Sequence, residues 1–132
     1  MSIWGHRVSK KAVTALVAAL VAVALVPALS WMPDREVVLV VRGMAFYVDG
    51  QDVPNPTIEV RAGERVRVVL RNEDRGLTHD FAVPALDRAL DPIHWHETSA
   101  VVFTAPSKPG SYDYVCRPHA LMMHGRLVVV AP

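Results

Sequence analysis

The chain has 132 residues and a formal net charge of +1, so it holds one domain and at most an appendage, without the basic excess typical of nucleic-acid binding. Hydrophobic residues make up 52% of it, which is high for a soluble domain, and much of this excess lies near the N-terminus. The single cysteine, Cys116, excludes an internal disulfide.

The N-terminal part contains a long apolar segment, residues 12–29, preceded by Arg7, Lys10 and Lys11. At roughly 18 residues it is near the shortest span that crosses a bilayer and near the longest core of a signal peptide. Basic residues in front of such a segment stay in the cytoplasm, so the chain that follows is exported. We therefore expect a hydrophobic helix within residues 1–30 that is either a membrane anchor or a signal peptide.

The remaining chain divides into a short linker, residues 31–35, and a domain over residues 36–132. This part carries 11 basic and 13 acidic side chains, and we expect it in the periplasm or on the outer face of the cytoplasmic membrane. A lone thiol outside the cytoplasm is unusual unless it is capped, paired with another chain or bound to a metal ion. The cysteine content therefore favours a metal site.

Apolar residues in this domain recur with a period of two, as in β-strands, and not with the period of 3.6 typical of helices. In one segment Val66, Val68 and Leu70 face one side while arginines face the other, which is the pattern of a half-buried strand. Proline- and glycine-rich turns separate seven or eight such segments and predict an antiparallel β-sandwich. The strands are expected within residues 36–48, 57–72, 78–84, 99–105, 111–116 and 125–132.

Cys116 and His119 are separated by two residues, so both side chains can reach one ion from one turn. Thiolate and imidazole together suit copper, zinc or an iron–sulfur centre. Pro118 stiffens this turn, and Gly125 permits a close return of the chain into the last strand. Two ligands are too few for a structural zinc site, which needs four from cysteine and histidine, so another histidine is required.

His79 is the best candidate for this second histidine, because it begins a predicted strand just after a loop and can face a neighbouring loop. Met122 and Met123 offer a soft thioether ligand, and a His₂Cys set with a weak axial methionine is the blue-copper arrangement. Two further histidines, His94 and His96, are candidates for a second, weaker metal site, although such a pair more often lies in a solvated loop.

The segment SYDYVCRPHALMMHGRLVVV resembles the C-terminal copper loop of the cupredoxins, the small type 1 (blue) copper proteins such as plastocyanin and amicyanin. The upstream segment RNEDRGLTHDF is similar to the one that carries the family's first histidine ligand. The resemblance covers residues 36–131 and implies a Greek-key sandwich that binds one copper ion through His79, Cys116 and His119, with an axial methionine. It also implies single-electron transfer.

Two features depart from the family pattern. Asp80 follows the first histidine where the family usually has asparagine; its carboxylate can still accept backbone hydrogen bonds, and its negative charge would favour oxidised copper. Met122 has the amicyanin-like spacing from the histidine ligand, whereas Met123 has the usual spacing from Gly125. We expect Met123 to be the axial ligand, with Met122 as the alternative, because the glycine fixes where the loop joins the strand.

These features predict an electron carrier and not an enzyme. Copper oxidases need further histidines beside the cysteine, and here its neighbours are Val115 and Arg117. Copper delivery, storage or sensing is the alternative, because the same ligands would serve it. We expect redox partner proteins, attachment to the membrane through residues 12–29 if this segment is not cleaved, and no nucleic-acid partner.

Overall fold

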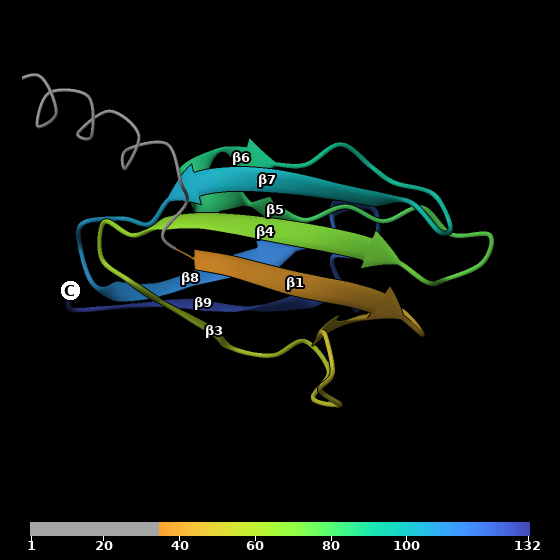
Figure 1. The fold of residues 1–132 in the computed structure, drawn as a ribbon, viewed down its shortest axis with the longest axis horizontal. Coiled ribbons are helices and arrows are strands. Elements are labelled where there is room, and N and C mark those ends of the chain that lie inside the picture. Colours follow the sequence, from red (N-terminus) through yellow and green to blue (C-terminus); the bar gives the residue numbers. More distant parts are fainter. Residues whose placement is uncertain (1–34) are drawn as a thin grey trace, which may run out of the picture. The chain divides into compact units, whose positions relative to one another are not determined.

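The computed structural model describes residues 35–132, which form two stacked β-sheets (Figure 1). The strand orders are β2–β1–β4–β7 and β3–β9–β8–β5–β6. The all-β prediction is confirmed, whereas the predicted helix, anchor or signal peptide within residues 1–30 lies outside the described residues. The elements are β1 (Arg35–Arg42), β2 (Ala45–Val48), β3 (Ile58–Arg61), β4 (Arg65–Asn72), β5 (Ala82–Val83), the 3-10 helix η1 (Pro84–Leu86), β6 (Arg88–Ala89), β7 (Thr98–Thr104), β8 (Gly110–Val115), the 3-10 helix η2 (Arg117–His119) and β9 (His124–Val130).

The sheets are mixed, which corrects the prediction of a purely antiparallel sandwich. β1 pairs in parallel with β4, and β3 pairs in parallel with β9, while the other pairs are antiparallel. Parallel neighbours need a crossover connection. Here the chain leaves the first sheet after β2, adds β3 to the second sheet and returns to the first as β4. Side-chain alternation is the same in parallel and antiparallel neighbours, so the sequence pattern could not distinguish the two directions of pairing.

The strand segment expected over residues 36–48 is a hairpin of β1 and β2. Its turn consists of Gly43 and Met44, which both have a positive φ, 58° and 61°, and it brings Arg42 opposite Ala45. Positive φ at both central residues is the geometry of the two-residue hairpin turn that fits the twist of the strands. Met44 is unusual there, because a side chain disfavours this conformation.

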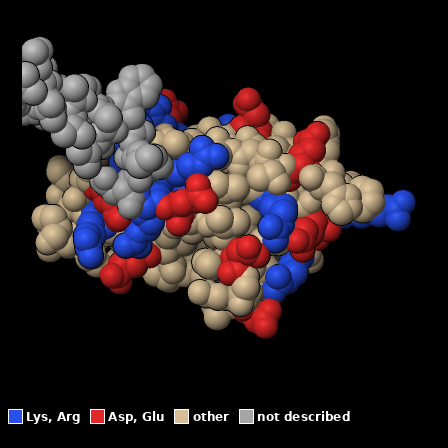
Figure 2. All heavy atoms as spheres, viewed as in Figure 1, with Lys and Arg blue, Asp and Glu red and all other residues tan. Residues whose placement is uncertain are grey.

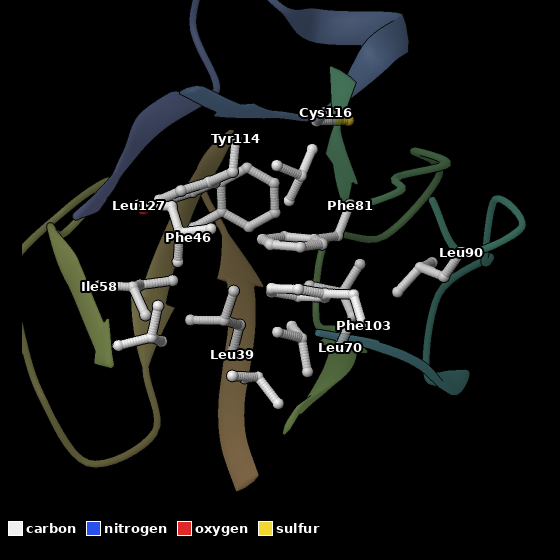
Figure 3. Close-up of a cluster of buried hydrophobic side chains, with 14 of the residues drawn as sticks. Leu39, Phe46, Ile58, Leu70, Phe81, Leu90, Phe103, Tyr114, Cys116 and Leu127 are labelled. Carbon is white, nitrogen blue, oxygen red and sulfur yellow. The ribbon is translucent and has the colours of Figure 1, made fainter. Parts of the chain in front are cut away.

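The core is a cluster of buried hydrophobic side chains that includes several aromatic rings (Figure 3). Phe46 of β2, Phe81 and Tyr114 of β8 have ring centroids 5.4–6.0 Å apart, and all three are fully buried. Cys116 belongs to this cluster and is itself buried. Cys116 is therefore packed within the hydrophobic core.

Charged residues of both signs are interspersed over the face of the domain shown in Figure 2. Several form surface ion pairs, such as Arg67 with Glu36 and Arg71 with Asp49. This mixture gives that face no single-sign patch for steering a partner. In the part of the chain that the structure describes, no helix has the length and hydrophobicity needed to cross a membrane.

Candidate metal centre

The loop between β8 and β9 carries three of the predicted ligands. The backbone N–H of Cys116 donates to the carbonyl of Met123 at 2.9 Å, which closes the loop at its base. Within it, the N–H of His119 donates to the carbonyl of Cys116, and the N–H of Met123 donates to the carbonyl of His119. Pro118 lies in the first turn of η2, where its missing N–H costs no hydrogen bond. The loop therefore presents its side chains from a fixed backbone.

His79 reaches the same place from another part of the chain. Its backbone pairs with Ile93 through hydrogen bonds of 3.1 and 2.8 Å, as an isolated bridge outside β5. The strand predicted over residues 78–84 is therefore shorter than expected, because β5 comprises only Ala82–Val83. The His79 imidazole is fully buried, and its Nε2 atom lies 3.0 Å from a carboxylate oxygen of Asp74.

The structure brings His79, Cys116 and His119 together as one group. The Cys116 Sγ atom lies 3.7 Å from His79 Nδ1 and 3.6 Å from His119 Nδ1, and all three donor atoms lie within 4.8 Å of one another. An ion at about 2.3 Å from sulfur and about 2.0 Å from each nitrogen would separate the sulfur from each nitrogen by roughly 3.5–3.7 Å at tetrahedral to trigonal angles. The donor set therefore fits a single metal ion.

The two methionines differ sharply in burial. Met123 is fully buried in the same cluster as Cys116, whereas Met122 is 59% exposed. Within residues 35–132, no other histidine, cysteine or carboxylate joins the three donors, so the group lacks the fourth ligand of a structural zinc site. A buried thioether beside a His₂Cys group favours copper, and it supports Met123 over Met122 as the axial ligand.

Comparison with known proteins identifies the family. Residues 15–129 match the family described as "Cupredoxin-like domain". The chain belongs to this family. No match was found among curated proteins by sequence.

Solved structures share the cupredoxin fold. Auracyanin B is 21% identical, with a TM-score of 0.61 over 75% of this chain and 91% of that one. A dithionite-reduced auracyanin from Roseiflexus castenholzii is 16% identical, with a TM-score of 0.59 over 75% of this chain and 99% of that one. An amicyanin variant in its reduced Cu(I) form is 23% identical, with a TM-score of 0.50 over 76% of this chain and 88% of that one.

Asp80 links the two ligand-bearing segments of this cupredoxin. Its carboxylate accepts a hydrogen bond from the backbone N–H of Arg117 at 2.7 Å, as predicted, and its own N–H points to the Cys116 sulfur at 3.5 Å. The Arg117 guanidinium also pairs with this carboxylate, through Nε at 2.6 Å. The charge expected from the aspartate is thus paired with a cation, and nothing in the sequence indicates this contact.

Two further residues hold the ligand loop, and neither stands out in the sequence. The Asn55 side chain donates to the carbonyl of Met122 and accepts from the N–H of Phe46, which ties the loop to β2. The ring of Tyr114 lies against the α-carbon of Gly125, where a Cβ atom would overlap it. Gly125 was expected to permit a close return of the chain into the last strand; in the structure its missing Cβ atom makes room for this ring.

The other candidate histidines do not form a second three-ligand group in residues 35–132. His94 Nδ1 lies 3.0 Å from the Thr78 hydroxyl, and the His96 ring lies 3.9 Å from that of Trp95. His96 has a φ of 65°, so the pair lies in a turn and not on a strand. A second metal at these residues stays a prediction.

Burial sets the protonation of the ligands in the metal-free protein. It lowers the pKa of His79, an effect that nearby His119 reinforces and Asp74 opposes. It also raises the pKa of the Cys116 thiol, although the N–H groups of Asp80 and His119 favour the thiolate. Near neutral pH the metal-free site therefore has a neutral His79 and a protonated Cys116.

Metal binding is consequently expected to release the thiol proton. Loading with Cu(II) near pH 7 should release about one proton per ion, and the apparent affinity should rise about tenfold per pH unit below the thiol pKa. Calorimetry in buffers of different ionisation enthalpy measures this release. Cys116→Ser should abolish it, and binding to the wild type without proton release would contradict the assigned thiol state.

Proposed function

We propose that this cupredoxin is a type 1 copper protein that carries single electrons. The observation that supports this most directly is the packing of the His79, Cys116 and His119 donor atoms within 4.8 Å of one another. Bound copper would supply a one-electron Cu(I)/Cu(II) couple there. We assign the axial position to Met123 because its side chain is buried beside this group.

The protein contributes a site that largely excludes water and whose ligand side chains are held in position. Cys116 and His79 are fully buried, so water has little access to the donor atoms. Backbone hydrogen bonds hold both ligand-bearing segments, and Asp80 joins them. Little rearrangement is then needed when the charge of the site changes. Buried ligands also disfavour rapid metal exchange, which favours an electron carrier over copper delivery, storage or sensing.

We place electron exchange at His119, the one partly exposed ligand. The surface around it is apolar and includes Leu121, which is 96% exposed, and Met122. The side chains that line this surface hollow are Met44, Pro118, His119, Ala120, Leu121 and Met122. Redox partner proteins would dock here, because an apolar patch desolvates readily against a matching surface.

We also propose that the domain works outside the cytoplasm, in the periplasm or at the outer face of the cytoplasmic membrane. The basic residues before residues 12–29 support export, and the lone cysteine is consistent with a metal-bound thiolate in an oxidising compartment. If residues 12–29 are not cleaved, they would attach the carrier to the membrane.

The visible absorption spectrum of the copper-loaded protein tests this function. An intense thiolate-to-copper band is expected, bleached by ascorbate and restored by reoxidation. Cys116→Ser should abolish the band, whereas Met122→Leu should retain it, because that methionine is largely exposed. A colourless protein, or a weak band that survives Cys116→Ser, would contradict a type 1 site. Rapid loss of copper to a competing chelator would favour copper handling.

A further inference from the structure

Asp74 lies directly behind His79. One carboxylate oxygen is 3.0 Å from His79 Nε2, while the other ring nitrogen, Nδ1, faces the Cys116 sulfur. The Asp74 side chain is only 12% exposed. Within residues 35–132 no lysine or arginine forms an ion pair with Asp74, and His79, which lies within ion-pair distance, is neutral near neutral pH. Asp80, the other carboxylate near the site, differs because it is paired with Arg117.

Three further hydrogen bonds fix Asp74. Its carboxylate accepts from the backbone N–H groups of Gly43 and Met44, at 2.6 and 2.9 Å. Its own N–H donates to the Asn72 side chain at 2.9 Å. The positive φ of both turn residues directs their N–H groups to one acceptor. Two backbone N–H groups of the β1–β2 hairpin therefore fix the carboxylate in the position where it contacts His79.

We propose that Asp74 is a positioning residue for His79, an inference that rests on the proposed copper function. By accepting the Nε2 proton, the carboxylate selects the tautomer in which the Nδ1 lone pair is directed to the site. It also makes the imidazole a stronger donor. The unneutralised negative charge stabilises Cu(II) more than Cu(I), so Asp74 lowers the reduction potential.

Two variants separate geometry from charge. Asp74→Asn keeps a hydrogen-bond acceptor and removes the charge, whereas Asp74→Ala removes both. Glu59→Gln is the matched control, because its side chain is exposed on β3, which pairs with the C-terminal part of β9. Circular dichroism and thermal unfolding establish that each variant is folded.

The first readout needs no metal. In the metal-free wild type, ¹⁵N NMR of the imidazole should place the His79 proton on Nε2. Asp74→Asn should retain this tautomer, and Asp74→Ala should give a mixture. A wild-type proton on Nδ1 would overturn the proposal. Because this readout is independent of copper, failure of the proposed function and failure of the Asp74 role are distinguishable.

The second readout uses the copper-loaded protein. Asp74→Ala should bind Cu(II) about tenfold more weakly. If Cu(I) binding is unchanged, this tenfold loss corresponds to a rise in potential of about 59 mV. Asp74→Asn should also raise the potential, whereas Glu59→Gln should not change it. Wild-type potentials in both folded Asp74 variants would overturn the role assigned to the charge.

Discussion

Gly125→Ala is expected to lower the free energy of unfolding of the metal-free protein by about 3 kcal/mol, the upper end of the usual cost of overpacking. The added Cβ would overlap the Tyr114 ring. This ring cannot move aside easily, because it packs between Phe46 and Phe81 and its hydroxyl donates to the carbonyl of Pro56. For a domain of this size, the melting temperature should fall by about 12–24 °C.

Gly110→Ala is the matched control for this substitution. Gly110 also lies in a strand, β8, but a Cβ atom there would meet only ordinary contacts, 3.7–3.9 Å from the Tyr112 ring. In the double variant Gly125→Ala/Tyr114→Leu, the overlap disappears, so the alanine should cost much less than in the wild-type background. Chemical denaturation measures the wild type, the two glycine variants, Tyr114→Leu as the reference for the second background, and the double variant. Equal losses in the two glycine variants would contradict the steric explanation.

Most of the candidate ligand group could be proposed from the sequence because its members are local. Cys116 and His119 lie in one turn, so their spacing alone indicates that their side chains can converge. The spacing of Met123 from Gly125 indicated the axial candidate, and the structure finds this methionine buried. His79 is distant in sequence, and its place followed from its position after a loop and from resemblance to the family.

The supporting contacts were not predictable because they join loops that are far apart in sequence. Asp74 is one of several acidic residues in polar loops, and nothing in the pattern shows that it meets the turn at Gly43. The turn at Gly43 lies within an apolar run of strand-forming residues, so the sequence pattern did not indicate a hairpin there. Asp80 stands out because it departs from the family pattern, but nothing in the sequence shows that its carboxylate meets the Arg117 guanidinium.

The Asp80–Arg117 pair is expected to respond very differently to loss of each partner. Asp80 is 1% exposed and Arg117 is 54% exposed. Arg117→Ala leaves a buried carboxylate with only its backbone hydrogen bond, at a cost of about 2 kcal/mol in the free energy of unfolding. Asp80→Asn leaves a guanidinium that water can solvate, and the amide oxygen can keep the bond to the Arg117 N–H. It should cost less than about 1 kcal/mol.

Removing Arg117 and removing the charge of Asp80 should shift the reduction potential in opposite directions. The Asp80 carboxylate acts electrostatically against the Cys116 thiolate, so Arg117→Ala, which leaves that negative charge unpaired, opposes reduction and lowers the potential. Asp80→Asn leaves a positive charge and raises it. The double variant removes both charges and should return towards the wild-type value. Arg126→Ala is the control, because its ion pair with Asp113 is largely exposed. Voltammetry measures the potentials of the wild type, the two single variants, the double variant and the control. Shifts of the same sign in both single variants would show that loop distortion outweighs charge at this site.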